Sequence, residues 1–408
     1  IIKQKKIKNI FYHGKSFKVH KSIELLCLKS NLSYFKENLI LYRLKFKSAY
    51  FLKGVLFFFI QILKNFKLTN NFKKYSQITF FSYFVHFKST SGRKFDSNLW
   101  GELPQKLNHE KKSINWFHFY VPSNQIKDSS KANKLKSELN LNRYENHNFI
   151  NSYLTFKNYF LSLFFYFILC LKNFFLLKKY TSFFNNKYSK SNFYYFLQED
   201  FFSSLFGSTM IYNLMNIQAL DKLLKNIPKQ KIGVYIIENQ SWEYCLIKFW
   251  RKYKHDKIIA YFNSSIRFWD LRYLKKNEEF KPLEKNPDEY FVNSKIFKSE
   301  AKKIGYPKKK LQLVEALRYN KLTHTSKIKK NKKILILGDI LIDETLNLLK
   351  FINKTVSKLK KYKFYFKPHP TMTLKSINML KSKYPYLEIA SINFEKFKNF
   401  EFVICSNG

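Results

Sequence analysis

From residue 229 onward, apolar runs of strand length alternate with segments that have the spacing of amphipathic helices. The strands that this pattern predicts are 231–239, 257–262, 290–294, 311–317, 334–339, 363–367, 387–390 and 401–406. The helices predicted between them are 241–254, 295–305, 343–361 and 373–384. Because parallel strands require a crossover that is usually a helix, the alternation predicts an α/β fold with parallel sheets covered by helices.

A basic linker at 327–333 divides the alternating pattern in two. We therefore expect two Rossmann-like domains with a cleft between them, the first at 96–326 and the second at 327–408. Residues 1–95 are basic and rich in aromatic residues, and their weak pattern places helices only loosely. The chain begins with Ile without a signal-peptide pattern and ends directly after a strand-like run, so we expect a fragment of a longer protein with a truncated second domain.

Two apolar stretches with flanking lysines, 54–63 and 158–171, raise the question of membrane contact. Both are shorter than the ~20 residues that a spanning helix needs. Three interpretations stay open at this point: a buried helix, an aromatic-rich helix in the interface of an anionic leaflet, and a true span.

The chain of 408 residues has a formal net charge of +47, from 75 Lys and Arg against 28 Asp and Glu. Such a charge is typical of proteins that bind polyanions, but here it is spread over the whole chain. Lys, Asn, Ile, Phe and Tyr are abundant together, as in a genome rich in A and T. No pattern of a nucleic-acid-binding module accompanies the charge, so we expect an anionic membrane surface rather than nucleic acid as a partner. The four cysteines have no metal-binding spacing, which favours a reducing compartment and no metal site.

The segment 364–373, "FYFKPHPTMT", places Lys367 and His369 beyond the end of a predicted strand. In open parallel sheets, ligands bind at such ends. Pro368 and Pro370 stiffen the backbone on either side of the histidine. His369 could therefore donate to a phosphate, assisted by the N-terminus of the next helix, or simply lie in a rigid turn.

A neighbouring strand end carries Ser406 and Asn407, whose polar groups are suited to the same phosphate, although "SNG" is also a common turn. Gly338, at another strand end, predicts that a ligand or a second backbone comes close. We expect three acids after it to cap the next helix rather than to bind metal, namely Asp339, Asp343 and Glu344.

In the first domain, Glu238 follows a strand and is the candidate general base, whereas Glu243 lies in the first turn of a helix and complements its dipole. Further candidates for substrate binding are Arg267, Asp270, Arg272, Glu315 and Arg318. The arginines near Asp270 suit recognition of a phosphate or carboxylate, and a structural Arg–Asp pair explains them equally well.

Six segments in this order carry a resemblance to a known family: "LWGELPQKL", "INWFHFYV", "IIENQSWEYCLI", "IRFWDLRY", "VEALRY" and "FKPHP". Together they resemble a bacterial family of surface-carbohydrate biosynthesis glycosyltransferases, linked to O-antigen and capsule synthesis. The resemblance covers roughly residues 98–408.

This resemblance implies the GT-B fold, with an acceptor-side domain at 96–326 and the beginning of a donor-binding domain at 327–408. The "HP" element is similar to one in bacterial sialyltransferases and in polymerases that use CDP-activated alditols. Carried over, it implies that His369 and Pro370 meet the phosphate of a cytidine nucleotide and that Ser406 assists. The implied activity is inverting, metal-independent transfer from a nucleotide sugar, a CMP-linked one among the options, with no other cofactor.

The implied acceptor is a glycan or a lipid-linked glycan. We expect the protein in the bacterial cytoplasm, with a peripheral position at the inner face of the inner membrane as an option. Two alternatives stay open: a non-catalytic basic protein that binds nucleic acid or membrane, and an inactive glycosyltransferase fragment.

Overall fold

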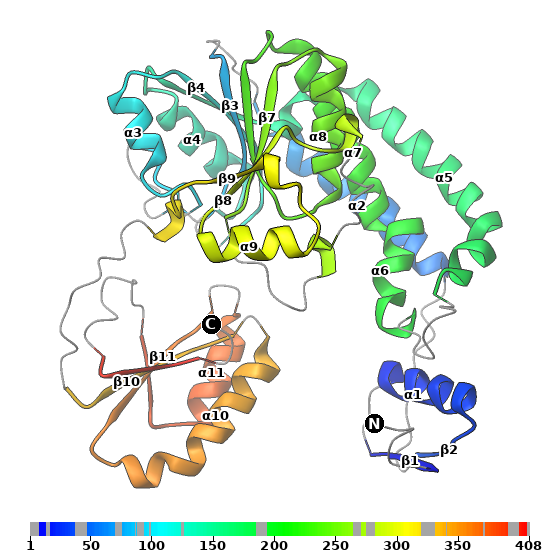
Figure 1. Ribbon diagram of the computed structural model, residues 1–408, viewed down its shortest axis with the longest axis vertical. Helices are drawn as coiled ribbons and strands as arrows, with labels where there is room; N and C mark the ends of the chain where they lie inside the picture. The colour runs from blue at the N-terminus through cyan, green and yellow to red at the C-terminus, as the bar shows by residue number, and fades with distance from the viewer. Residues whose placement is uncertain are drawn as a thin grey trace. The chain divides into compact units, whose positions relative to one another are not determined.

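The computed structural model divides the chain into two compact units, Ile1–Arg318 (unit 1) and Tyr319–Gly408 (unit 2), which are described separately (Figure 1). The residues that the structure describes are 8–13, 17–36, 47–69, 76–85, 87, 94–97, 99–123, 126–184, 194–263, 271–274, 282–319, 331–339, 341–369, 372–390 and 400–405.

Unit 1 is built on a sheet of seven strands in the order β5-β4-β3-β6-β7-β8-β9, and every neighbouring pair is parallel. The strands are β3 (Ile78–Tyr83), β4 (Ile114–Phe119), β5 (Glu145–Phe149), β6 (Ile232–Ile236), β7 (Lys257–Tyr261), β8 (Glu289–Val292) and β9 (Leu311–Leu313). The prediction of parallel α/β sheets is confirmed.

The strand order is that of a doubly wound sheet, because the chain starts in the middle at β3 and runs outward through β4 and β5. It then returns to the other side of β3 and runs outward again from β6 to β9. The direction reverses between β3 and β6, which makes their carboxyl ends the topological switch point. Since β3 lies within residues 1–95, the sheet begins before the predicted domain boundary at residue 95, and Ile78–Tyr83 belongs to its centre.

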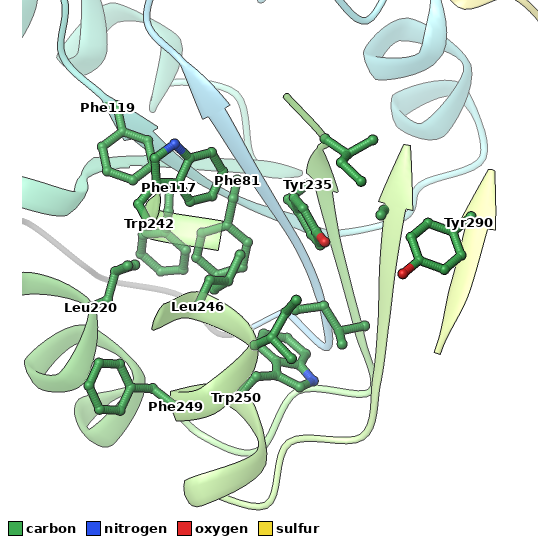
Figure 2. Packing of buried hydrophobic residues seen from close by; sticks show 14 of the residues in the cluster. Phe81, Phe117, Phe119, Leu220, Tyr235, Trp242, Leu246, Phe249, Trp250 and Tyr290 are labelled. Carbon is green, nitrogen blue, oxygen red and sulfur yellow. The ribbon is translucent and has the colours of Figure 1, made fainter. Parts of the chain in front are cut away.

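Helices and apolar cores cover both faces of this sheet, and neighbouring residues of one strand face opposite cores, as Phe80 and Phe81 do. One core contains the apolar side of α8, where Trp242, Leu246 and Trp250 pack against β-sheet residues (Figure 2). The main helices of these layers are α3 (Leu103–His109), α4 (Ser129–Leu139), α7 (Ser208–Asn226), α8 (Ser241–Lys252) and α9 (Lys295–Lys303).

Gly233 in β6 is a glycine for a steric reason. A Cβ atom at this position would lie 2.6 Å from the indole of Trp250, which fills the space above the strand. The indole is fully buried, and its Nε1 donates to the backbone oxygen of Asp256 at 2.9 Å. Its position is therefore fixed by this hydrogen bond on one edge and by the contact with Gly233 on the other. The bulkiest side chain of α8 thus requires the smallest residue of the sheet.

A helical layer with a core of its own is formed by α2 (Lys47–Phe66), α5 (Phe156–Ser182), α6 (Tyr194–Phe206) and α7. The two apolar stretches with flanking lysines are the centres of α2 and α5, and both helices extend beyond them. Each helix is buried on one side and exposes apolar side chains on the other, so neither is the fully buried helix of the first interpretation. Within the described residues, α5 is one helix that is long and apolar enough to cross a membrane.

The remaining elements of unit 1 are short or lie near its start. A parallel pair, β1 (Asn9–Tyr12) and β2 (Ser33–Lys36), is joined by α1 (Phe17–Ser30). Single turns of 3₁₀ helix are Ile150–Tyr153, Leu271–Tyr273, Leu283–Lys285, Lys308–Lys310 and Leu317–Tyr319.

Unit 2 has a parallel sheet of four strands in the order β12-β11-β10-β13, again with its first strand between the second and the last. The elements are β10 (Lys333–Leu337), α10 (Ile342–Val356), a 3₁₀ turn (Ser357–Leu359), β11 (Lys363–Lys367), α11 (Leu374–Lys383), β12 (Leu387–Ile389) and β13 (Phe402–Ile404). Each matches a predicted strand or helix. Most of the predicted linker 327–333 lies outside the described residues, and the cleft stays a prediction.

Candidate functional site

Two regions meet the expectation that ligands bind at the carboxyl ends of parallel strands. In unit 1 this region is the switch point between β3 and β6, and in unit 2 it is the end of β11 beside β10.

At the switch point of unit 1, Tyr83 is the last residue of β3 and Glu238 follows β6. Trp242, in the first turn of α8, donates a hydrogen bond from its indole Nε1 to the Tyr83 hydroxyl at 3.0 Å. The Tyr83 hydroxyl also lies close enough to the Glu238 carboxylate for each group to shift the pKa of the other. Two side chains from two separate elements, β3 and α8, therefore lie at the strand end that carries Glu238.

Burial raises the pKa of Glu238 above its ordinary value, while the charge of Arg272 and the hydrogen bond from Tyr83 act in the opposite direction. Burial also raises the pKa of Tyr83, and the nearby Glu238 carboxylate adds to that shift. A half-buried carboxylate whose proton affinity is increased has the property that a general base needs.

Arg272 approaches the same place from the 3₁₀ turn Leu271–Tyr273, and its Nη1 donates to the backbone oxygen of Glu238 at 3.4 Å. The structure thus brings together two of the predicted site residues, Glu238 and Arg272. The two other candidates of that segment, Arg267 and Asp270, lie outside the described residues.

The backbone around Glu238 is fixed by Glu243, which is buried at the start of α8. Its carboxylate accepts hydrogen bonds from the backbone N–H groups of Glu238 and Gln240, both at 2.8 Å, and forms a capping box with Gln240. The predicted role of Glu243 at the helix N-terminus is confirmed, and the bonds also fix the turn that presents Glu238. Asn239 in this turn has a φ of 55°, a conformation that asparagine tolerates better than most residues.

Two amide side chains at neighbouring strand ends have buried polar atoms without a partner. The register of β6 and β7 pairs Ile236 with Tyr261, so that residues 238 and 263 both follow directly beyond the paired segments. Asn239 Nδ2 and Asn263 Oδ1 are buried and make no hydrogen bond within the part of the chain that the structure describes. Asn239 also lines a small pocket with Tyr244 and Lys285. Buried amides of this kind are suited to a polar ligand or to ordered water.

Glu315 and Arg318, which follow β9, are not brought to the switch point. β9 is the edge strand, three strands from β6, which corresponds to roughly 14 Å at the usual strand spacing. Glu315 instead pairs with Lys106 at 3.5 Å on the surface. The carbonyl oxygen of Leu317 approaches Gly101 so closely that a Cβ there would lie 2.1 Å from it. This strand end therefore joins the β9 edge to the segment before α3.

In unit 2, the end of β11 lies against the end of β10. Leu337 pairs with Lys367, and the backbone N–H of Gly338 donates to the Lys367 oxygen at 2.9 Å. A Cβ at Gly338 would lie 3.1 Å from the backbone nitrogen of His369. The expectation that another backbone comes close to Gly338 is confirmed, and that backbone belongs to His369.

His369 begins a tight turn, because its carbonyl oxygen accepts from the backbone N–H of Met372 at 2.9 Å. The next helix, α11, begins at Leu374 and is capped by the Thr373 hydroxyl, which accepts from Ser376 N at 3.2 Å. Burial lowers the pKa of Lys367. Three further predicted site residues, Pro370, Ser406 and Asn407, lie outside the described residues.

The acids after Gly338 lie around the start of α10. Asp339 Oδ1 accepts from Leu341 N at 3.1 Å, and Asp343 and Glu344 lie in the first turn of α10. Among the described residues, no cluster of His, Cys, Asp or Glu has the arrangement of a metal site. The N-cap of α10 is Leu341 and it has no side-chain capping hydrogen bond, so the prediction that these acids cap the helix is wrong; Asp343 and Glu344 instead complement its dipole.

Sequence reasoning does not identify Tyr83, Trp242 or Asn263 as site residues. Tyr83 and Trp242 are separated by more than a hundred residues, and only the pairing of β3 with β6 brings them together. Trp242 belongs to the apolar residues with helical spacing in 241–254, which indicates a position in the core. That pattern gives no indication of its hydrogen bond with Tyr83. Strand order would have been the necessary signal, and it cannot be read from periodicity.

Comparison with known proteins gives a likeness of fold without a family. No protein-family model matches the chain, and no curated protein is significantly similar to it, so the family resemblance stays a prediction. Similar solved structures include a UDP-GlcNAc 2-epimerase from Methanocaldococcus jannaschii, with 11% identity over 80% of this chain and 78% of that chain and a TM-score of 0.40. Another is the structure of TarM, with 10% identity, coverage of 80% and 79%, and a TM-score of 0.42.

A third is the UDP-GlcNAc 2-epimerase from Neisseria meningitidis bound to UDP-GlcNAc, with 10% identity, coverage of 81% and 77%, and a TM-score of 0.42. Likeness at this level of identity and TM-score does not carry an activity or a substrate over to this chain.

Proposed function

We propose that the protein is a GT-B glycosyltransferase of surface-polysaccharide synthesis, for O-antigen or capsule, that uses a nucleotide sugar and inverts the anomeric configuration without a metal. The observation that carries the proposal is Glu238, a half-buried carboxylate of raised pKa held at the switch point of unit 1 by Tyr83 and Arg272. The acceptor is a glycan or a lipid-linked glycan. A CMP-linked sugar is the first donor to test.

In the proposed reaction, Glu238 removes the proton from the acceptor hydroxyl as its oxygen attacks the anomeric carbon of the donor. The new bond forms between this oxygen and the anomeric carbon, and the bond from that carbon to the donor phosphate breaks. The electron pair leaves with the phosphate, and the proton stays on Glu238. Its raised pKa favours this transfer, because the carboxylate binds the proton more strongly than an exposed one.

The donor phosphate is assigned to the end of β11 in unit 2. His369 and Lys367 would donate to the leaving oxygens, with Pro370, Ser406 and Asn407 as partners that rest on the sequence alone. The close approach of Gly338 to the His369 backbone supports this, because it holds the turn beside the switch point of the second sheet. Donors aimed at the charge that develops on a leaving group are an effective source of catalysis.

Titration calorimetry with CMP, CDP and UDP tests the donor site directly. We expect His369→Ala to weaken nucleotide binding roughly tenfold or more, as removal of a charge-assisted hydrogen bond does. His109→Ala is the matched control, because this exposed histidine lies in α3. Equal affinity of wild type and His369→Ala would refute the phosphate role, and release of the sugar from a donor panel would identify the substrate.

The proposed reaction takes place in the bacterial cytoplasm, at the inner face of the inner membrane, where lipid-linked acceptors are available. The charge of +47 also favours a second candidate function, the binding of a polyanion without catalysis. Binding to RNA or DNA that falls steeply with salt, together with no turnover of any nucleotide sugar, would support this second function. No binding and no turnover would indicate an inactive fragment.

A further inference from the structure

The outer face of α5 is a stripe of exposed apolar side chains. Phe160, Leu171 and Phe175 expose 68%, 62% and 74% of their surface. The stripe, named here the α5 face, consists of Phe156, Phe160, Phe164, Leu171, Phe174 and Phe175. Soluble monomers seldom expose a contiguous apolar surface of this kind without a partner.

Polar contacts fix the opposite face of α5 to the helical layer. The Tyr166 hydroxyl lies 2.6 Å from the Phe206 carbonyl oxygen and 3.0 Å from that of Phe51. Asn173 donates from Nδ2 to the carbonyl oxygen of Leu205 at 2.8 Å. A Cβ at Gly54 of α2 would lie 2.1 Å from the Tyr166 hydroxyl oxygen, so the two helices pack closely at this point.

These contacts decide between an interfacial and a spanning helix. If α5 crossed a bilayer alone, the side chains of Tyr166 and Asn173 would leave their partners and enter hydrocarbon, which is costly. If α5 lies in the interface, the buried face keeps its bonds and only the α5 face enters the lipid. At about 1.5 Å per residue, the 27 residues of α5 would extend for roughly 40 Å along the surface.

The charges around the stripe define the kind of surface that it fits. Neither α5 nor α2 contains an acidic residue. Four exposed lysines accompany the α5 face, namely Lys157, Lys172, Lys178 and Lys179. Lysines at both ends of a stripe complement anionic headgroups. They disfavour a second copy of the chain, because an antiparallel pair would place the lysines of one copy against those of the other.

We propose that the α5 face is an interfacial anchor, which inserts its apolar side chains between the headgroups and acyl chains of an anionic bilayer. This inference goes beyond the transfer reaction, because α5 contains none of the residues proposed for that reaction. It assigns the membrane contact to one face of one helix, and it explains why that face is both aromatic and free of acids.

Flotation of the full chain with lipid vesicles tests the anchor. The wild type is expected to float with vesicles of phosphatidylcholine and phosphatidylglycerol, and weakly with phosphatidylcholine alone. The variant Phe160→Ser/Leu171→Ser/Phe175→Ser is expected to bind the anionic vesicles at least roughly tenfold more weakly than the wild type, because it loses most of the inserted apolar area. The matched control is Leu141→Ser/Ile296→Ser/Phe351→Ser, which removes equally exposed apolar residues elsewhere and leaves binding unchanged.

A second variant separates charge from apolar insertion. Lys157→Gln/Lys172→Gln/Lys178→Gln is expected to lower binding to anionic vesicles roughly a hundredfold, at about 1 kcal/mol per lysine, and to leave the weak binding to neutral vesicles unchanged. Nucleotide binding, measured by calorimetry, stays at the wild-type value in all these variants. A failure of the anchor is therefore distinguishable from a failure of the proposed transfer reaction.

Three results would overturn the proposal. The first is equal flotation of the wild type and the serine variant. The second is a dimer by light scattering that the serine variant converts to monomer, with no flotation of either protein. The third is a wild type that resists extraction from vesicles by alkaline carbonate, since a spanning helix resists it and an interfacial helix is released.

Discussion

The two strand-end regions share a strand order but are assembled in different ways. In both sheets the first strand in the chain lies between the second and the fourth strand of the same sheet. In unit 1 the region is made of side chains from separate elements, with Tyr83, Trp242 and Arg272 around Glu238. In unit 2 it is made largely of one segment, in which His369 follows Lys367 and rests against Gly338.

The difference corresponds to two kinds of chemistry. A carboxylate must be partly removed from water before its proton affinity rises, and this requires neighbours from several elements. A phosphate site needs donors and positive charge at an accessible edge, and one stiff segment beside a backbone can supply these. The comparison therefore predicts that Glu238 of unit 1 affects the rate of the reaction alone, whereas unit 2 determines the affinity for the donor and also contributes to the rate by donating to the leaving phosphate.

The largest expected effect is that of Glu238→Gln on turnover. Loss of a general base lowers the rate by roughly 10²- to 10⁴-fold, and donor affinity should remain unchanged because the residue belongs to unit 1. The wild-type rate should also fall as the pH decreases through the raised pKa of Glu238, since only the ionised form accepts a proton. Steady-state kinetics with the identified donor, combined with calorimetry, would measure both quantities.

Glu315→Gln is the control for this substitution, because Glu315 is an exposed carboxylate at the end of β9 that pairs with Lys106. Its turnover should equal that of the wild type. Equal losses in both variants would contradict the role of Glu238, and so would a loss of donor affinity in Glu238→Gln alone.

The second effect concerns the packing that supports the unit 1 site. Gly233→Ala places a Cβ 2.6 Å from the rigid indole of Trp250, and overpacking of this kind costs about 1–3 kcal/mol of unfolding free energy. Urea unfolding followed by tryptophan fluorescence would measure it, because all five tryptophans of the sequence belong to unit 1. An unchanged midpoint would show that Trp250 is free to move.

The third effect is expected at the corresponding glycine of unit 2. Gly338→Ala brings a Cβ to 3.1 Å from the His369 backbone nitrogen, so the turn must shift by a few tenths of an ångström. Donors placed out of line lose part of their interaction, and we expect nucleotide affinity to fall about tenfold. The tryptophan unfolding curve of unit 1 should not change. If Gly338→Ala altered that curve and left the affinity unchanged, the prediction that unit 2 determines donor affinity would be refuted.

The alternating half of the sequence could be predicted because strands and helices there differ in period. The strands and helices predicted between 231 and 406 correspond to β6 to β13 and α8 to α11, and the apolar side of α8 is the predicted one. Glu238 could be predicted because it follows a buried strand, and Arg272 because an arginine near Asp270 and among aromatic residues suits recognition of an anion. What period alone cannot give is the strand order, and hence the partners Tyr83 and Trp242.

The first half of the sheet could not be predicted, and β5 shows the reason. Its residues Glu145–Phe149, "ENHNF", are polar in four of five positions, yet every one is buried. Several of their polar groups are satisfied by buried hydrogen bonds, as when Glu145 accepts from Asn108 of α3 and pairs with His147 at 2.8 Å. A hydrophobic pattern cannot reveal a strand whose burial depends on hydrogen bonds to residues distant in sequence.

The smallest expected effect is a pH dependence of stability. It arises from the polar chain, the row of buried hydrogen-bonded side chains Glu145, His147 and His118. His118 Nε2 lies 3.0 Å from His147 Nδ1, and His118 Nδ1 has no hydrogen-bond partner among the described residues. Burial, and then the charge of His147, lower the pKa of His118 well below 6.5, so the folded protein keeps it neutral. The unfolded chain protonates it near pH 6.5, so unfolding free energy should fall by about 1.4 kcal/mol between pH 7.5 and about pH 5.5.

His118→Phe should remove this part of the pH dependence, whatever it costs in stability at pH 7.5. His109→Ala, at an exposed histidine, should leave the dependence unchanged. Urea unfolding at several pH values, followed by tryptophan fluorescence, would compare the three slopes in unit 1. Parallel slopes for wild type and His118→Phe would mean that His118 is protonated in the folded state, and that the polar chain behind β4 and β5 is open to water.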